Sequence, residues 1–359
     1  MNFDMEINMT SREVAHLRMA NQQLAGTHFT RPADLVQWMT CMQAQDYGMA
    51  RWAVGCRLRK ASDVSVEQDF SDGKILRTHV LRPTWHFVCP ADIRWLLKLS
   101  AARVKAMSRV YHQKLGIDYA ILRQSKKIIT KALSKHHRLT REELTFILHK
   151  EKINVSDGRA GHLLMDAELD ALICSAGRTG NQFSYQLLDE AVPLSDLPGS
   201  EESIAELAKR YFFSRGPASI HDFAWWGNLS LSEARKGLDM NKQHLQRVSV
   251  NGNDYWFSLK APLQRPSGRS AFLLPAFDEY MIAYRNRDDV LDPRFAGQCS
   301  FGLAPVIVYN GQVAGAWRRR GKKGSVQIES GHFGAAPART ATRAFSAATR
   351  RYLAFMAKG

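Results

Sequence analysis

The order of the predicted elements is the feature that most limits how this chain can fold: short helices followed by two short strands, three times over. The first set has amphipathic helices at 12–25, from Pro32 onward and at 47–59, then strands at 75–80 and 84–88. Three short helices followed by a two-stranded ribbon are the outline of a winged helix. We therefore predict an α+β, mostly helical chain built from such modules.

Two further sets repeat this order. The second has helices at 123–134, 140–150 and 160–171 and a hairpin that joins 171–175 to 183–187. The third has helices at 202–214 and 232–239 and a hairpin that joins 245–250 to 255–259. The candidate helix N-caps are Ser11, Asp46, Thr140, and either Ser230 or Ser232. The sets share element order and not residues, so the modules are inferred from order alone.

The expected domain bounds are 10–90, 91–192 and 200–262, with a final segment at 263–359. Linkers rich in Pro and Gly are predicted at 193–199 and 262–268. In the final segment, strands at 306–309 and 312–317 flank Asn310-Gly311, which is the strongest hairpin signal in the chain. A strand at 272–277 precedes this hairpin, and a basic helix at 337–357 ends the chain.

Composition narrows the class of partner. The formal net charge is +16 and the pI is about 9.8, which favours nucleic acid first and a membrane surface second. A basic enzyme without either partner remains an alternative. The N-terminus lacks the features of a signal peptide, and no apolar stretch is long enough to cross a membrane. We expect a cytoplasmic protein that is associated with the nucleoid.

Several kinds of site are not indicated. The five cysteines form no CxxC pair, and we read them as reduced core residues rather than a disulfide frame or a zinc site. Phosphate-binding GxxxxGK[ST], GxGxxG, HExxH and Gly-x-Ser-x-Gly motifs are all missing. The adjacent His136 and His137 point apart on a helix and favour a solvated face over a ligand pair. We therefore predict no cofactor and no metal.

Gln43 and Gln45 stand two residues apart where the second helix is predicted to end. An amide pair is an unusual choice for a core, and in a basic chain it favours a site that handles a polar group without a strong base. The alternative is a pair of exposed glutamines at a helix end.

Two other segments concentrate polar and aromatic side chains. In the segment 82–86, Arg82 is suited to hold a phosphate, and Thr84 and His86 alternate onto one face of a strand beside Trp85. A buried, satisfied histidine beside a core tryptophan is the alternative. Asp278 and Tyr280 follow the strand at 272–277 and are candidate substrate contacts. There the alternative is a buried carboxylate that pairs with Arg285 or Arg287.

Four motifs together resemble one family in order and spacing. They are Leu17-Arg18, Met42-Gln43-Ala44-Gln45-Asp46-Tyr47, Leu81-Arg82-Pro83-Thr84-Trp85-His86-Phe87-Val88 and Leu274-Pro275-Ala276-Phe277-Asp278-Glu279-Tyr280. The chain resembles the bacterial winged-helix DNA glycosylases of the AlkZ and YcaQ type from about residue 10 to the C-terminus. The resemblance implies three tandem winged-helix modules in a C-shape around DNA, with a basic concave face. It also implies a catalytic Gln-x-Gln, here Gln43 and Gln45, as in the AlkZ branch.

The implied activity is that of a monofunctional DNA glycosylase that excises alkylated purines and unhooks interstrand crosslinks. A purine alkylated at N7 or N3 is cationic and leaves without protonation, so orienting a water is the task left to the two amides. Gln43 and Gln45 are then expected near Arg82, Thr84 and His86. The expected partner is double-stranded DNA, bound by a monomer. Its phosphates are held by basic residues of the final segment, namely Arg318, Arg319, Arg320, Lys322 and Lys323.

Two rival functions stay open on the sequence alone. A non-enzymatic winged-helix regulator would present Arg, Asn or Gln from a recognition helix. The candidate helices at 47–59 and 160–171 are apolar on several faces, which disfavours it. A basic metabolic enzyme lacks any cofactor or nucleophile motif to support it.

Overall fold

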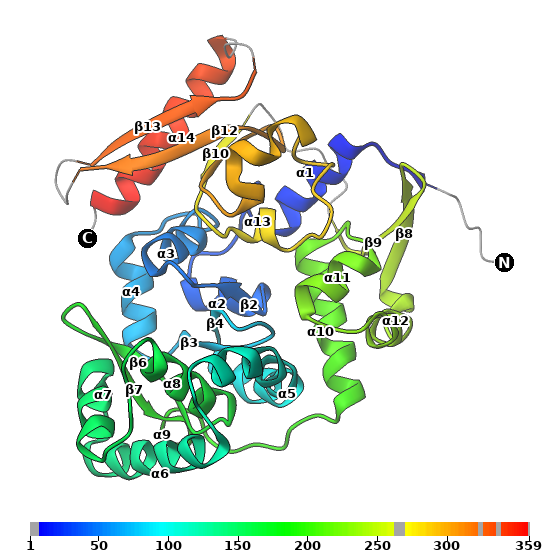
Figure 1. Ribbon diagram of the computed structural model, residues 1–359. Coiled ribbons are helices and arrows are strands. Elements are labelled where there is room, and N and C mark those ends of the chain that lie inside the picture. Colours follow the sequence, from blue (N-terminus) through cyan, green and yellow to red (C-terminus); the bar gives the residue numbers. More distant parts are fainter. Residues whose placement is uncertain (1–6, 262–269, 322–325, 335–338, 358–359) are drawn as a thin grey trace. The chain divides into compact units, whose positions relative to one another are not determined.

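The computed structural model of the protein (Figure 1) describes residues 7–261, 270–321, 326–334 and 339–357. The chain divides into two compact units. The first takes in Met1–Val66 and Ile204–Gly359, and the second is Glu67–Ser203. The first unit is therefore assembled from segments far apart in the sequence, with the second inserted between them.

Four short elements open the first unit. They are α1 (Ser11–Asn21), α2 (Pro32–Trp38), β2 (Cys41–Gln43) and α3 (Tyr47–Gly55). A capping box begins α1, and Thr10, not the predicted Ser11, accepts the N–H of Glu13. α3 begins as predicted, because the Asp46 side chain accepts the N–H of Met49. The unpredicted α4 (Asp63–Ser71) leads the chain into the second unit.

The helix that begins at Pro32 ends sooner than predicted, so Gln43 lies in a strand and not at a helix end. Thr40 has a φ of +63°, which lies outside the range of a right-handed helix, so the helix cannot continue through this residue. Residues 41–43 are extended. Two side chains more than 170 positions away, those of Arg215 and Glu279, bond the backbone of Cys41 and Gln43, which local pattern could not reveal.

The later part of the first unit begins with three helices and a hairpin. These are α10 (Ser200–Arg215), α11 (Ile220–Gly227), α12 (Leu231–Asp239), β8 (Leu245–Val250) and β9 (Asn253–Ser258), with a 3₁₀ turn at Lys242–His244. Ser230, one of the two predicted caps, starts α12 in a capping box with Glu233. The strand β1 (Ile7–Asn8) adds in parallel to β8. Val14 and Leu17 of α1 pack on the hairpin residues Val248 and Phe257.

The chain ends in an antiparallel sheet covered by a helix. Its strands, in the order β10 (Ala271–Leu274), β11 (Val306–Tyr309), β12 (Gln312–Arg320) and β13 (Gln327–His332), are packed by α14 (Arg339–Ala357), shown in red in Figure 1. The short helix α13 (Glu279–Ile282) and a 3₁₀ helix at Pro293–Gly302 connect β10 to β11. The Asn310-Gly311 hairpin is confirmed, and both residues have the positive φ that a tight type I′ turn requires.

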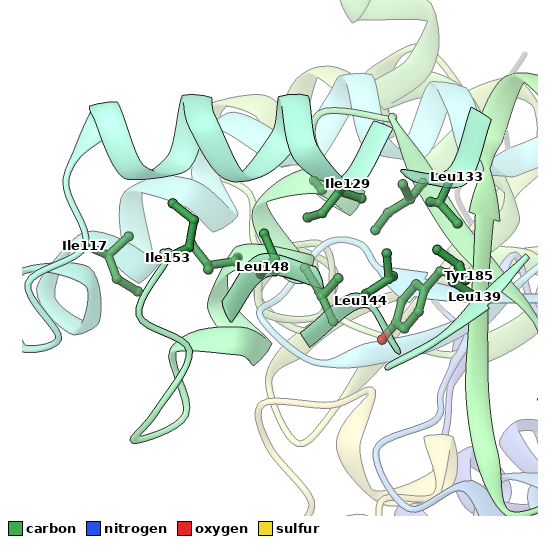
Figure 2. Packing of buried hydrophobic residues seen from close by; sticks show 12 residues of the cluster. Ile117, Ile129, Leu133, Leu139, Leu144, Leu148, Ile153 and Tyr185 are labelled. Atoms are coloured by element: carbon green, nitrogen blue, oxygen red, sulfur yellow. The ribbon is translucent and has the colours of Figure 1, made fainter. Parts of the chain in front are cut away.

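The second unit contains two hairpins, two long helices and several shorter elements. Its elements are β3 (Leu76–His79), β4 (Trp85–Val88), α5 (Pro90–Lys114), α6 (Tyr119–His136), β5 (Leu139–Thr140), α7 (Arg141–Lys150), α8 (Arg159–Leu169), β6 (Ile173–Thr179), β7 (Gln182–Leu187) and α9 (Leu188–Ala191). The core between α6, α7 and the β6–β7 hairpin is aliphatic, with Ile129, Leu133, Leu144 and Leu148 meeting Tyr185 (Figure 2). The capping box at Thr140 is as predicted.

The predicted order of helices followed by a hairpin therefore recurs at β3–β4, β6–β7 and β8–β9. The linker predicted at 262–268 lies outside the described residues. All five cysteines are buried, which confirms their reading as core residues, and none of them is bridged in the structure. Within the described ranges, no helix is both long enough and apolar enough to cross a membrane.

Candidate catalytic segment

Gln43 is the last residue of β2, and Gln45 lies in the bend between β2 and α3. Burial alternates along this segment: Met42 and Ala44 are buried, Gln43 is half-buried and Gln45 is exposed. The two apolar side chains are packed in the core of the unit, and the two amides are more accessible than their apolar neighbours.

A buried ion pair holds the backbone of this segment. Arg215, at the end of α10, donates from Nη1 to the carbonyl oxygen of Met39 at 2.9 Å and from Nη2 to that of Cys41 at 2.8 Å. The carboxylate of Glu279 accepts the backbone N–H of Gln43 at 3.0 Å through Oε1. Its Oε2 accepts hydrogen bonds from Nε and Nη2 of Arg215 at 3.0 and 2.8 Å. Arg215 and Glu279 together therefore bond alternate backbone positions along the segment.

The surroundings of this pair exclude water. Arg215 and Glu279 expose 0% and 1% of their surface. The indole N–H of Trp226 donates to Glu279 Oε2 at 3.1 Å, and the Arg215 guanidinium lies 4.3 Å from the centre of the Trp226 ring. Charges in such a place are stable only when paired and fully hydrogen-bonded, so geometry here is tightly specified.

A second buried pair lies beside the first. Arg57, which follows α3, makes a bidentate contact with Asp278, from Nη1 to Oδ2 at 2.8 Å and from Nη2 to Oδ1 at 2.7 Å. Burial alone would lower the pKa of Arg57, but the charge of Asp278 raises it above its ordinary value. Nη2 also donates to Oε1 of Gln22 at 2.9 Å, which ties α1 to the end of α3. The partner of Asp278 is thus Arg57, not the predicted Arg285 or Arg287.

The placement of Asp278 and Tyr280 does not fit the direct DNA contact that we expected from the sequence. Both are 0% exposed. Asp278 also caps α13 by accepting the N–H of Tyr280. The Tyr280 hydroxyl lies 2.9 Å from the carbonyl oxygen of Gly311 and 3.2 Å from that of Ala15, and burial raises the pKa of this phenol well above its ordinary value. Side chains without exposed surface hold the fold together and do not reach a duplex.

The segment 82–86 belongs to the second unit. Arg82, Thr84 and Trp85 are half-buried, and His86 is fully buried with its Nδ1 2.9 Å from the carbonyl oxygen of Thr84. Trp85 packs between the guanidinium of Arg77, 4.3 Å from its ring centre, and the ring of His79. His86 is therefore buried, as in the alternative, whereas Trp85 is half-buried and not a core residue. The expected nearness of this segment to Gln43 and Gln45 stays a prediction, because those residues belong to the first unit.

The basic run forms the exposed end of β12. Arg318, Arg319 and Arg320 are exposed. Arg318 and Arg320 both pair with Glu329 on β13, and hydrogen bonds from Arg318 lower the pKa of that carboxyl. Such exposed pairs are weak and are readily exchanged for phosphate contacts. Lys322 and Lys323 lie outside the described residues.

Comparison with known proteins decides the family. A family model described as "DNA glycosylase AlkZ-like" matches residues 36–355, which is most of the chain. The chain belongs to this family. A relative from Streptomyces sahachiroi, named "Interstrand DNA cross-link repair glycosylase", is 24% identical over 324 residues, which cover 85% of this chain and 87% of the relative. The solved structure of Streptomyces sahachiroi DNA glycosylase AlkZ has the same mixed helix and sheet fold, with a TM-score of 0.79 at 21% identity, covering 98% of this chain and 97% of the other.

Membership in the AlkZ-like family settles the class of activity. The protein is a DNA glycosylase, a hydrolase of N-glycosyl bonds, and this favours the enzyme over the non-enzymatic regulator. Within the described ranges, no three His, Cys, Asp or Glu side chains gather as a metal site would require.

Sequence reasoning missed the residues that hold the AlkZ-like Gln-x-Gln segment in place. Glu279 lies in a motif that was selected for its neighbours Asp278 and Tyr280. The sequence pattern indicated no role for Arg215 or Arg57. The motif Asp278-Glu279 was the available signal. Two adjacent carboxylates after an apolar strand need two buried cations, and those cations lie 64 and 221 residues away in the sequence.

Asp46 offers a test that separates the amides from their acidic neighbour. We expect Asp46→Ala to destabilise the protein by about 1 kcal/mol, because the N-cap of α3 is lost, and to leave base excision within about twofold of wild type. Thermal unfolding and an excision assay on the same preparation would measure both effects. If Asp46→Ala abolishes excision while Gln45→Ala does not, the aspartate is the base and the roles assigned here are reversed.

Proposed function

We propose that this glycosylase removes cationic purines alkylated at N7 or N3, with Gln43 and Gln45 orienting the attacking water. The observation that carries the proposal is that two amides, both more accessible than the buried Met42 and Ala44, stand on a segment whose backbone is held by buried charges. Amide oxygens accept hydrogen bonds from water without taking a proton outright.

The chemistry needs little more than orientation. The bond between C1′ and N9 of the alkylated purine breaks, and its electron pair neutralises the positive charge of the departing base. The oxygen of the oriented water forms the new bond to C1′, and its proton passes to solvent. Because the sugar centre is oxocarbenium-like, water placement lowers the barrier without a strong base. Normal purines, which are poor leaving groups when uncharged, would be left in place.

Crosslinked bases are a second proposed substrate. The name of the relative from Streptomyces sahachiroi refers to interstrand cross-link repair. A crosslinked base is tethered to the opposite strand and cannot swing into a deep pocket, so a site on an exposed segment suits it. Gln45 is exposed and Gln43 is half-buried, which agrees with an open site of this kind.

The DNA would be gripped through its phosphates by a monomer. We propose that the three sets of helices and hairpin are winged-helix modules, and that exposed cations, including Arg318 and Arg320, bind the backbone. A nucleoid location would follow from this binding.

The salt dependence of DNA affinity tests the proposed phosphate contacts. With a formal charge of +16, the protein should bind duplex DNA with an affinity that falls about a hundredfold or more between 50 and 200 mM salt, because bound counterions are released. Undamaged sequences should differ little. Fluorescence anisotropy with several unrelated duplexes would measure this. Tight binding to one palindrome, far above random DNA, would instead indicate a sequence-reading regulator.

Lesion charge tests the chemistry. We expect excision of N7-methylguanine and no detectable excision of O6-methylguanine from otherwise identical duplexes, because only the first base departs from a cationic state. Alkali treatment of the reaction mixture would reveal the abasic sites as strand breaks. Equal excision of both lesions would mean that the protein protonates or flips its target, and the orienting role of Gln43 and Gln45 would be lost.

A further inference from the structure

We propose that Glu279 and Arg215 are positioning residues for the glycosylase reaction, acting on Gln43 and Gln45 through the backbone that carries them. The proposal rests on the proposed function, in which those two amides orient the water. Neither Glu279 nor Arg215 would touch the substrate, because both are buried. Their effect would pass through the hydrogen bonds that they make to residues 39, 41 and 43.

The three bonded backbone groups belong to alternate residues at the junction of α2 and β2: Met39 is the C-cap of α2, and Cys41 and Gln43 lie in β2. Arg215 donates hydrogen bonds to the carbonyl oxygens of Met39 and Cys41 at 2.9 and 2.8 Å, and Glu279 accepts a hydrogen bond from the N–H of Gln43 at 3.0 Å. In an extended chain, the polar groups of alternate residues point to the same side. Within β2, the carbonyl oxygen of Cys41 and the N–H of Gln43 therefore point to one side, and Arg215 and Glu279 hold both of them by hydrogen bonds.

The same geometry explains why the pair must be a carboxylate and a guanidinium. Around Glu279, the donors are Gln43 N–H on one oxygen and Arg215 with Trp226 on the other. If glutamine replaced Glu279, the NH₂ group of its amide would face another hydrogen-bond donor, whichever way the amide was turned. A lysine in place of Arg215 would have one ammonium where the planar fork now spans two carbonyl oxygens and a carboxylate. Either change leaves part of the segment without its partner.

Small displacements matter for an oriented water. A shift of about 1 Å in a group that positions a reactant costs on the order of a hundredfold in rate, even when binding is unchanged. Because Gln43 is bonded directly and Gln45 follows two residues later, loss of the Arg215–Glu279 pair should lower the rate constant for excision. The dissociation constant for DNA should not change, since neither residue is exposed.

The neighbouring pair supplies a matched control. Arg57 and Asp278 are also 0% exposed and bidentately paired. The bonds described for Arg57 lead to Gln22, Ala53, Cys56 and Asp278, and not to residues 39–45. Arg57→Lys therefore damages a buried ion pair of the same kind without touching the backbone of the Gln-x-Gln segment.

The experiment compares Arg215→Lys and Glu279→Asp with Arg57→Lys, at a temperature where all three are folded. Single-turnover excision of N7-methylguanine should slow by about tenfold or more in the first two and by less than about threefold in Arg57→Lys, with similar losses of melting temperature. Glu279→Asp keeps the charge beside Arg215, so it supplies the test if Arg215→Lys does not fold. Equal slowing in all three variants, or no slowing in the first two, would overturn the positioning role.

Hydrogen exchange gives a readout that does not depend on activity. The amide of Gln43 should exchange faster in Arg215→Lys and Glu279→Asp than in wild type and in Arg57→Lys, because its acceptor has moved. Unchanged protection of a peptide covering residues 40–46 would overturn the proposal. A wild-type protein without excision activity would refute the proposed function, and the exchange data alone would then decide whether the pair holds the segment.

Discussion

Replacing Gln45 by Ala should lower the rate of excision of a cationic purine by about a hundredfold or more, the scale expected when a water-orienting group is removed. The amide is exposed, so its loss leaves the fold almost unchanged, and melting temperature and DNA affinity should stay close to wild type. Single-turnover kinetics on N7-methylguanine DNA would measure the rate, and anisotropy would measure binding.

The conservative variant Gln45→Glu gives a second test of this role. It keeps an oxygen that can accept a hydrogen bond from water but adds a negative charge on an exposed side chain. We expect it to retain more activity than Gln45→Ala. A Gln45→Ala enzyme that works at the wild-type rate would place the chemistry elsewhere, with Gln43 as the first residue to examine.

The second large effect concerns stability. Asp278→Ala should lower the free energy of unfolding by about 3–5 kcal/mol, because it strands the fully buried Arg57 without its counter-charge. Denaturant titration followed by circular dichroism would measure the loss. Asp34→Ala is the control: it removes the exposed pair with Arg31, and we expect it to cost less than about 1 kcal/mol.

The comparison of these two aspartates tests the corrected role of Asp278. If Asp278→Ala were as mild as Asp34→Ala, the buried pair would not hold α1, α3 and α13 together. An unfolding free energy near that of wild type, combined with weak DNA binding, would bring back direct DNA contact as the role of Asp278.

Local signals in the sequence predicted local structure well. Asp46, Thr140 and Ser230 stand at helix N-caps as expected, because capping depends on residues within one turn. The Asn310-Gly311 turn was recoverable because few residues adopt consecutive positive φ angles. The resemblance in motif order also led to the right family, since four motifs spread over the chain are specific together.

The misses have physical causes. The helix α5 (Pro90–Lys114) was not predicted because its N-cap, Cys89, makes no side-chain cap and leaves only Pro90 as a starting signal. The strand containing Gln43 was taken for a helix end because it has only three residues and because two side chains that bond its backbone, Arg215 and Glu279, lie far away in the sequence. For the second of these reasons, Asp278 was paired with nearby arginines instead of Arg57. Buried charge pairs between distant segments leave no periodic pattern.

The most direct test of the account compares wild type with the double variant Gln43→Ala/Gln45→Ala on duplex DNA carrying one N7-methylguanine, followed by alkali. We expect abasic sites, and hence strand breaks, at the lesion with wild type and almost none with the double variant, while both proteins bind the duplex equally. Strand breaks at equal rates with both proteins, or none with wild type bound to the DNA, would contradict it.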